Sequence, residues 1–181
     1  GATSDDKSKW KYNYGETMEH VLFGDWQICF QTYIDLYNMD REPAEYKIAR
    51  AKEVMEYEMS TPNNDFWWWA DGLYMVMPVM TKLYKVTDNQ QYLDKLYEYF
   101  TYAKNLMYDE ESALFYRDGK YIYPKHKTNQ GLKDFWSRGN GWVFAGLAKV
   151  LQDLPENDVH RAEYITIYQA MAKSLATAQQ E

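Results

Sequence analysis

The sequence predicts an all-α fold built from helical hairpins. A pattern of aromatic residues, a glycine and a charged or polar residue occurs three times, and each copy runs into a segment that is apolar on nearly all sides. A more polar segment with one apolar stripe follows each copy, whereas β-strand patterns are nearly absent. A helix that is apolar all round is buried, and a helix with one stripe packs on one side only. Each pair of segments therefore predicts a buried inner helix and an amphipathic outer helix.

The three inner segments begin at Leu22, Trp67 and Phe135, and we expect inner helices over residues 24–38, 70–86 and 140–152. Apolar residues recur at steps of three and four in the first two outer helices, and apolar residues lie on one side of the third. These residues are Ala44, Ile48, Ala51, Met55 and Met59 in the first, Tyr92, Leu96, Tyr99 and Ala103 in the second, and Ala162, Ile165, Ala172 and Leu175 in the third.

The segment 113–124 is the exception to the helical pattern. Asp118-Gly119 stands there between residues of high β propensity, and this dipeptide is a signal for a hairpin turn. The segment lies between the second and third helical hairpins. We therefore expect a β-hairpin insert that folds over one end of the helices.

The composition of the chain limits the classes of ligand that we expect it to bind. A length of 181 residues and a hydrophobic fraction of 46% indicate one globular domain. A net charge of −7 without a basic stripe argues against nucleic acid. No apolar run approaches the roughly 20 residues that a membrane span needs. Aromatic residues make up 18% of the chain, and their amphipathic rings suit sugars, which have apolar faces and hydroxylated rims.

Metal and cofactor sites are not indicated. Cys29 is the only cysteine, so neither an internal disulfide nor a cysteine-based zinc site is expected. The three histidines, His20, His126 and His160, do not have the spacing of metal ligands. We therefore expect no metal and no cofactor.

Three charged residues occupy the same place in the repeated pattern. Asp25, Asp71 and Arg138 each stand near the start of an inner helix. Because an antiparallel outer helix intervenes each time, consecutive inner helices run parallel and begin at the same end. Helix N-termini also carry partial positive charge. We expect these three side chains at one rim that favours an anionic ligand.

Two of the repeated segments resemble motifs of the unsaturated rhamnogalacturonyl hydrolases and the closely related unsaturated glucuronyl hydrolases. They are Trp68-Trp-Ala-Asp-Gly-Leu-Tyr-Met75 and Phe135-Trp-Ser-Arg-Gly-Asn-Gly-Trp142, and the resemblance extends over residues 10–181. It implies an (α/α) toroid of six hairpins, of which three are present here as a partial ring. It also implies that residues 1–181 are the N-terminal portion of one glycosidase domain. The charged N-terminal residues themselves predict that residues 1–12 form a flexible arm.

The resemblance implies a glycoside hydrolase that acts on oligosaccharides with a 4,5-unsaturated uronic acid at the non-reducing end, as in the breakdown of rhamnogalacturonan and pectin. A carboxylic acid protonates the double bond, water adds, and the resulting hemiketal opens. The family often has a histidine in the insert before the Trp-Ser-Arg motif, where this chain has Tyr116-Arg117-Asp118.

The resemblance assigns Asp71 and Asp25 as the catalytic carboxylates. Asp71 follows three tryptophans, and desolvation by indoles disfavours its charged form, although an aspartate here also fits a helix cap. Arg138 is the candidate for binding the substrate carboxylate. The remaining candidates for substrate binding are Trp68, Trp69, Trp136, Asn140 and Trp142.

Two other classes of protein stay open at this point. One is a different (α/α) toroid enzyme, either a sugar epimerase or an ordinary glycosidase with paired carboxylates. The other is a non-catalytic helical-repeat module that binds peptides. Three hairpins also leave apolar edges uncovered, so we expect the chain to self-associate or to pack against the missing half of a ring.

Overall fold

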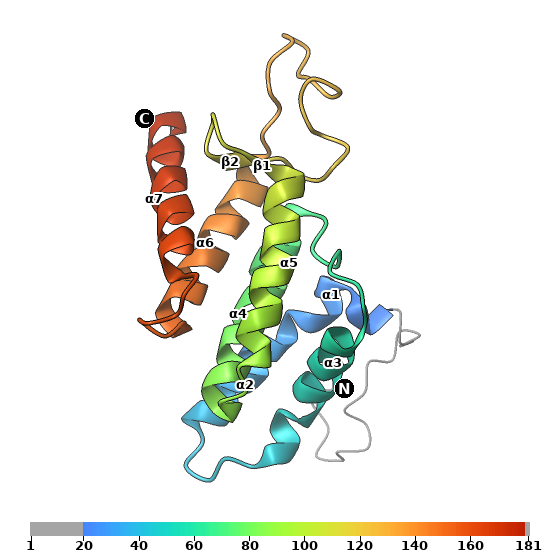
Figure 1. Cartoon of the computed structure of the whole chain (residues 1–181), viewed down its shortest axis with the longest axis vertical. Helices are drawn as coiled ribbons and strands as arrows, with labels where there is room; N and C mark the ends of the chain where they lie inside the picture. The colour runs from blue at the N-terminus through green and yellow to red at the C-terminus, as the bar shows by residue number, and fades with distance from the viewer. Residues whose placement is uncertain (1–19, 180–181) are drawn as a thin grey trace.

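The protein is described by a computed structural model that places residues 20–179, and it is a set of paired helices (Figure 1). Helices account for 64% of it, which confirms the all-α prediction. The expected arm over residues 1–12 lies outside the described residues. The α-helices are α1 (Gly24–Gln27), α2 (Cys29–Met39), α3 (Ala49–Ser60), α4 (Ala70–Thr87), α5 (Gln91–Met107), α6 (Ser137–Asp153) and α7 (Arg161–Ala178).

The inner and outer helices lie where the sequence predicts them, with shifts at their ends. The stripe predicted for the third outer helix is wrong, because the buried side of α7 is formed by Tyr164, Ile167 and Met171, whereas Ala162 is exposed. The helix expected at 24–38 is two segments, α1 and α2, which meet at Ile28. The helix expected at 140–152 begins earlier, at Ser137, so the start of α6 contains the charged motif. Within residues 20–179, no helix is both long and apolar enough to cross a membrane.

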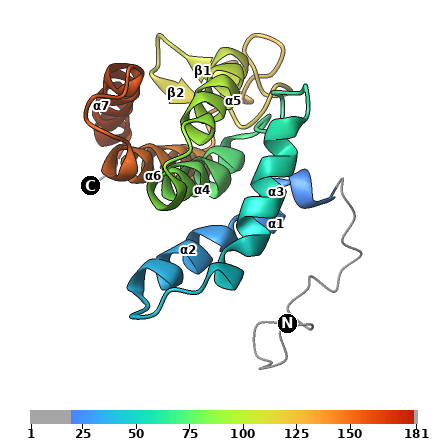
Figure 2. The ribbon, with the colours of Figure 1, turned by 60° about the horizontal axis from the view of Figure 1, so that its bottom comes forward.

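Helix α4 is the centre of the packing. It contacts α1 and α2 on one side and α6 on the other, while α5 packs on α4 and α7 packs on α6. Figure 2 shows α5 and α7 on one side of α4 and α6, with α2 on the other. The backbones of α4 and α6 approach closely at Gly146, where a Cβ atom would lie 3.0 Å from the carbonyl oxygen of Leu73.

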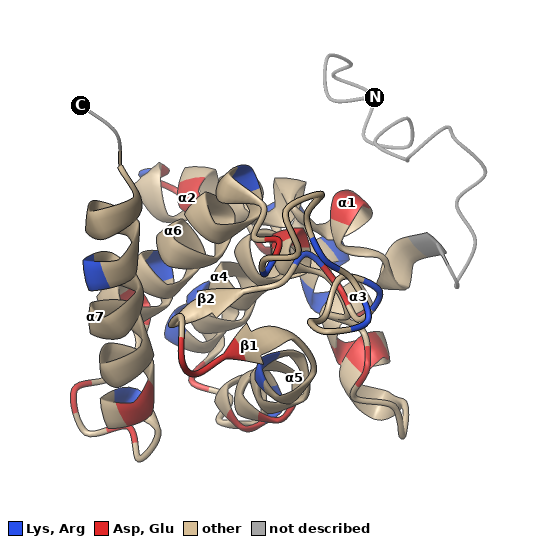
Figure 3. Ribbon diagram, turned by 90° about the horizontal axis from the view of Figure 1, so that it is seen from above, with Lys and Arg blue, Asp and Glu red and all other residues tan. Residues whose placement is uncertain are grey.

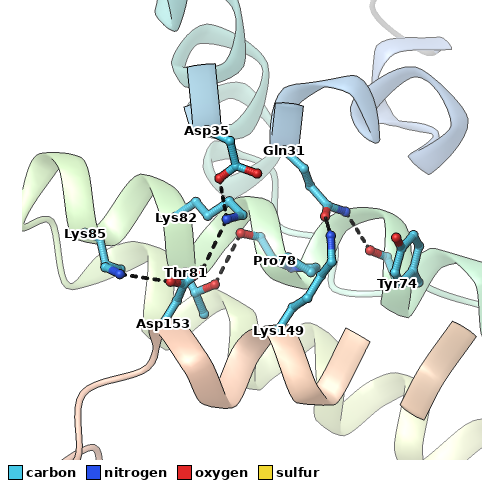
Figure 4. A network of polar contacts seen from close by, with 9 residues as sticks. All are labelled: Gln31, Asp35, Tyr74, Pro78, Thr81, Lys82, Lys85, Lys149 and Asp153. Carbon is cyan, nitrogen blue, oxygen red and sulfur yellow. Dashed lines mark hydrogen bonds and ion pairs between the residues drawn. The ribbon is translucent and has the colours of Figure 1, made fainter. Parts of the chain in front are cut away.

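A buried glutamine forms hydrogen bonds to backbone carbonyls of α4, one of which lacks its usual helical partner. Pro78 lies inside this helix and has no N–H to donate to the carbonyl of Tyr74. Nε2 of Gln31, on α2, donates to the carbonyl oxygens of Tyr74 at 2.8 Å and Met75 at 3.0 Å. Nζ of Lys149, on α6, donates to Oε1 of Gln31 at 2.7 Å. Figure 4 shows that this set of bonds joins the three inner helices.

A second polar cluster joins the same helices further along α4. Nζ of Lys82 lies 2.5 Å from Oδ1 of Asp35, on α2, and 3.5 Å from Oδ2 of Asp153, at the end of α6. Lys85 also pairs with Asp153, at 2.9 Å (Figure 4). Because Lys82 and Asp153 are largely buried, each charge depends on its partners for compensation.

The predicted hairpin turn at Asp118-Gly119 is wrong. The strands are β1 (Tyr108–Asp109) and β2 (Leu114–Phe115), which pair antiparallel around a turn at residues 110–113. The turn contains Ala113 with φ at +50°, a conformation that the sequence does not signal. Asp118 instead accepts the backbone N–H of Lys120 at 2.8 Å through its side chain, so Asp118-Gly119 forms a local turn in an irregular insert.

Glu58 is a fully buried carboxyl on the inner side of α3. Its Oε2 accepts a hydrogen bond of 2.6 Å from Nε2 of Gln27, and its Oε1 has no partner. Burial raises the pKa of Glu58 to about 8, while the Gln27 hydrogen bond acts in the opposite direction. The carboxyl is therefore mostly protonated in the folded protein at neutral pH.

Gly146→Ala should destabilise the protein, whereas Gly141→Ala in the same helix should stabilise it. Overpacking costs about 1–3 kcal/mol, which exceeds the roughly 1 kcal/mol gained by replacing glycine with alanine in a helix. A Cβ at Gly141 meets nothing within 4 Å, so only the gain applies there. Urea unfolding measures both. A stabilised Gly146→Ala variant would show that α4 and α6 can separate without cost.

Stability should fall as pH rises from about 4.5 to about 8, in part because of Glu58. Its pKa is higher in the folded than in the unfolded state, so its contribution is complete below the unfolded pKa and is lost as pH passes the folded one. Unfolding free energies measured across this range should depend less on pH in Glu58→Gln. The exposed Glu156→Gln should keep the wild-type slope, and equal slopes in all three proteins would contradict the assignment.

Candidate active site

The inner helices present their N-terminal ends at the end of the molecule that carries the insert (Figure 1). Asp25 lies in the first turn of α1, Asp71 in the first turn of α4, and Arg138 is the second residue of α6. Figure 3 looks onto this end and shows acidic residues at α1 and α4 near basic residues of the neighbouring segments. We call these three residues and the side chains around them the rim.

Asp71 is the residue on which the charges of the rim act. Its side chain is partly buried, and this burial is the largest influence and raises its pKa above the ordinary value. A backbone hydrogen bond and the charges of Arg138 and Arg117 act to lower the pKa, while the charge of Asp25 acts to raise it. Asp25 itself is exposed. The structure thus brings the three predicted charged residues together, as parallel inner helices require.

The guanidinium of Arg138 packs on an aromatic ring. Its guanidinium carbon lies 4.5 Å from the centre of the Trp136 ring, a cation–π distance. Trp136 in turn folds back over Gly139, where a Cβ atom would lie 2.5 Å from the indole. The glycine of the motif is therefore required for this arrangement. Arg138 is exposed and forms no ion pair with any described residue, so its charge is available to a ligand.

The two tryptophans before α4 are placed differently. Trp68 is 44% exposed, whereas Trp69 is 8% exposed and packs against Gly24 and Gly72. The Phe23 ring stacks on Trp69 at 4.7 Å, and Trp68 lies 4.8 Å from Trp69. Of these two tryptophans, Trp68 is the one whose ring is exposed at the rim. Trp69 supports it from within the core.

Tyr74 and Trp142 form a second aromatic pair, one helical turn after the charged residues of the rim. Tyr74 follows Asp71 by three residues in α4, and Trp142 follows Arg138 by four in α6, so each aromatic residue lies on the same side of its helix as the charged residue. The two rings are 4.6 Å apart, and Nζ of Lys149 lies 5.1 Å from the Tyr74 ring. Trp142 is 36% exposed, which leaves part of its surface open to a ligand.

Asn140 is buried and its amide is fully used by the backbone. Its Oδ1 accepts the N–H of Phe115 at 2.8 Å, and its Nδ2 donates to the carbonyl oxygens of Phe115 at 2.9 Å and Trp136 at 3.2 Å. These bonds fasten β2 to α6. Both amide hydrogens are used within the protein, so Asn140 positions the insert, and direct binding of a sugar hydroxyl by Asn140 stays a prediction.

Arg117 is a further rim residue, on the insert. Its carbonyl oxygen accepts the N–H of Ala70 at 2.9 Å, beside Asp71. The sequence offers Arg117 and Lys125 as two further candidate cations for an anionic ligand because of their place in the insert, whereas no helical or strand periodicity points to them.

Within residues 20–179, no group of three or more His, Cys, Asp and Glu side chains is arranged to hold a metal ion.

Comparisons with known proteins place the chain in a family. The family model for Glycosyl Hydrolase Family 88 matches residues 3–181. A protein of Formosa agariphila named unsaturated 3S-rhamnoglycuronyl hydrolase is 38% identical over 96% of this chain and 50% of its own length. A protein of the same name from an Alteromonas species is 36% identical over 94% of this chain and 46% of its own. The chain thus spans about half the length of these relatives.

Solved structures are likewise similar to nearly all of this chain over about half of their own length. A structure described as a glycosyl hydrolase family 88 protein from Bacteroides vulgatus is 60% identical, with a TM-score of 0.88, over 99% of this chain and 51% of that one. Another, described as a polysaccharide lyase, is 68% identical with the same TM-score over 99% of this chain and 50% of that one. A family 105 glycoside hydrolase of C. acetobutylicum shares the fold at 23% identity, covering 92% and 49% of the two chains with a TM-score of 0.72. Because the family model covers nearly the whole sequence, this chain belongs to glycosyl hydrolase family 88.

Proposed function

We propose that this chain supplies the acid–base part of the active site of a hydrolase that removes a 4,5-unsaturated uronic acid from the non-reducing end of oligosaccharides. The observation that carries the proposal is the Asp71 carboxyl, which is partly buried, has a raised pKa and lies beside Arg138 and Asp25. The names of the relatives from Formosa agariphila and Alteromonas, both unsaturated uronyl hydrolases, support the same reaction class.

Asp71 acts first as an acid and then as a base. Its raised pKa favours the protonated carboxyl more than in an ordinary aspartate, and this proton is transferred to C4 of the uronide double bond. The positive charge that develops at C5 is shared with the ring oxygen. The Asp71 carboxylate then accepts a proton from the water that adds to C5. The resulting hemiketal opens and releases the neighbouring sugar.

The other rim residues bind and orient the substrate. The exposed guanidinium of Arg138 matches the planar carboxylate of the uronide, which it binds through two parallel hydrogen bonds. Burial is the main cause of the raised pKa of Asp71, and the negative charge of Asp25 adds to it. Trp68 and Trp142 offer exposed ring surface to the apolar sides of the sugars, while Trp136 supports Arg138. Neighbouring sugars of a small oligosaccharide are thereby held against the rim.

Residues 1–181 form the N-terminal portion of a single six-hairpin domain under this proposal. Large apolar side chains are exposed on α2, where Leu36 is 57% and Met39 is 80% exposed, and before α7, where Val159 is 85% exposed. These are the two ends of the row of inner helices and their partners. Either the remainder of a longer chain or a second copy of this one covers them.

Asp71→Asn in the full-length protein should lower turnover of an unsaturated uronide by about 100- to 10,000-fold, because it removes the proton donor while keeping the shape of the side chain. Loss of the ultraviolet absorbance of the conjugated double bond measures the reaction.

Asp65→Asn is the matched control, because Asp65 is exposed, lies six residues before Asp71 and has no place at the rim. It should keep wild-type turnover. An Asp71→Asn variant that turns over at the wild-type rate would exclude Asp71 as the acid. Turnover that releases sugar without loss of the absorbance would exclude hydration as the reaction.

The 181-residue chain on its own should self-associate, since soluble monomers avoid large exposed apolar patches. Sedimentation should give a mass above the 21.6 kDa of one chain. Met39→Ser should reduce the association, whereas the exposed polar change Asn63→Ser should leave it unchanged. A stable monomer at all concentrations would contradict the proposal of covered edges.

A further inference from the structure

The irregular part of the insert, residues 117–132, leaves the helices and returns to them at one place (Figure 1). Tyr116 stands directly before this segment, and Lys133 and Phe135 follow it. The Tyr116 ring stacks on the Phe135 ring, with ring centres 4.8 Å apart. The two ends of the segment therefore lie side by side, and the second end leads directly into the rim at Trp136.

Asp109, in β1, forms hydrogen bonds with both ends of this segment. Its Oδ2 accepts a hydrogen bond from the Tyr116 hydroxyl at 3.1 Å, and its Oδ1 accepts one from Nζ of Lys133 at 2.8 Å. Oδ1 also accepts the backbone N–H of Ser112 at 2.8 Å, which fixes the carboxylate within the turn between β1 and β2. The side chains of Asp109 and Lys133 are 16% and 24% exposed, so their ion pair is screened less than a pair on the surface.

Both partners of this ion pair carry their charges. Burial acts to raise the pKa of Asp109, but the hydrogen bonds that it accepts, the one from Lys133 first, outweigh burial and lower the pKa. The hydrogen bonds to Asp109 and Glu111 raise the pKa of Lys133. Asp109 is therefore a carboxylate at neutral pH, and it contacts both ends of the segment in that form.

The second end of the segment bears on the arginine that we propose to bind the uronide carboxylate. Lys133 precedes Trp136 by three residues, and the Trp136 ring packs on the Arg138 guanidinium at 4.5 Å. Asn140 holds the carbonyl of Trp136 at 3.2 Å, whereas the residues before Trp136 are held by the contacts of Lys133 and Phe135. Arg138 is exposed, so its guanidinium depends on the Trp136 ring for its orientation.

We infer that Asp109 is a positioning residue, which joins the two ends of the segment 117–132 and thereby keeps Trp136 against Arg138 in the orientation that receives the substrate carboxylate. Asp109 acts through Lys133 and Tyr116 and does not itself touch substrate. An oriented guanidinium loses less side-chain entropy when it binds a ligand, so the contribution of Asp109 lies in substrate affinity. The inference rests on the proposed function, because it takes Arg138 to bind the uronide.

Steady-state kinetics of the full-length protein on an unsaturated uronide test the inference. Asp109→Asn keeps the shape of the side chain and removes the charge that holds Lys133. It should lower kcat/KM by about 10- to 100-fold, mainly through KM, because a misplaced guanidinium binds the carboxylate less well in the ground state and in the transition state alike.

Glu111→Gln is the matched control for this variant. Glu111 also contacts Nζ of Lys133, at 2.7 Å, and its replacement likewise deletes one negative charge, but its side chain is 87% exposed. An ion pair with so exposed a partner contributes little, so Glu111→Gln should keep the wild-type KM and kcat.

A double variant distinguishes positioning from a general loss of structure. In Arg138→Gln the guanidinium is absent, so adding Asp109→Asn should change KM by less than about threefold. If Asp109 only stabilised the fold, its effect would be the same with and without Arg138. Lys133→Gln breaks the same ion pair from its more exposed partner and should repeat the increase in KM, which keeps the test available if Asp109→Asn does not fold.

The outcomes separate the inference from the proposed function. A wild-type KM in both Asp109→Asn and Lys133→Gln, or equal effects of Asp109→Asn with and without Arg138, would overturn the role of Asp109 and leave the proposed function standing. A wild-type KM in Arg138→Gln would overturn the proposed role of that arginine, and the inference with it. Failure of the wild-type protein to turn over the unsaturated uronide would overturn the proposed function as a whole.

Discussion

The hydrogen bonds of Gln31 are the constraint on which the arrangement of the inner helices depends. Pro78 leaves the carbonyl of Tyr74 without its helical partner in the middle of α4, and an unsatisfied carbonyl in a core destabilises the fold. The Gln31 amide satisfies it from α2, and Lys149 holds the other end of that amide from α6. One defect in the central helix therefore fixes the position of both of its inner neighbours.

This joint and the contact at Gly146 determine where the rim residues lie. Because α6 approaches the backbone of α4 at Gly146, the first turns of the two helices start side by side, with Arg138 on one and Asp71 on the other. Asn140 then ties the insert to α6, and Ala70 ties it to α4. The rim is assembled mainly through hydrogen bonds to backbone groups, and among its charged side chains Arg138 forms no ion pair with any described residue.

The periodic features of the fold are predictable from the sequence, and the contacts without a period are not. Apolar stripes at helical spacing locate the helices, and equal places in a repeat locate Asp25, Asp71 and Arg138 at one end. The bonds of Asn140 depend on where β2 lies, and the burial of Trp69 depends on the path of α1, so a motif alone could not separate these two residues from Trp68 and Arg138. The Asp118-Gly119 signal failed because the strands pair one turn earlier, around Ala113.

The opposed influences on Asp71 suit a group that must act as acid and then as base. In the free protein, burial raises its pKa while Arg138 and Arg117 act against it. When Arg138 binds a uronide carboxylate, as proposed, a negative charge enters the rim and offsets that of the arginine, so the protonated form of Asp71 is favoured when substrate is present. Once the proton has moved, the positive charge at C5 favours the carboxylate, which is the form that accepts a proton from water. Under the proposed mechanism, the substrate itself therefore shifts Asp71 between the two states that the reaction requires.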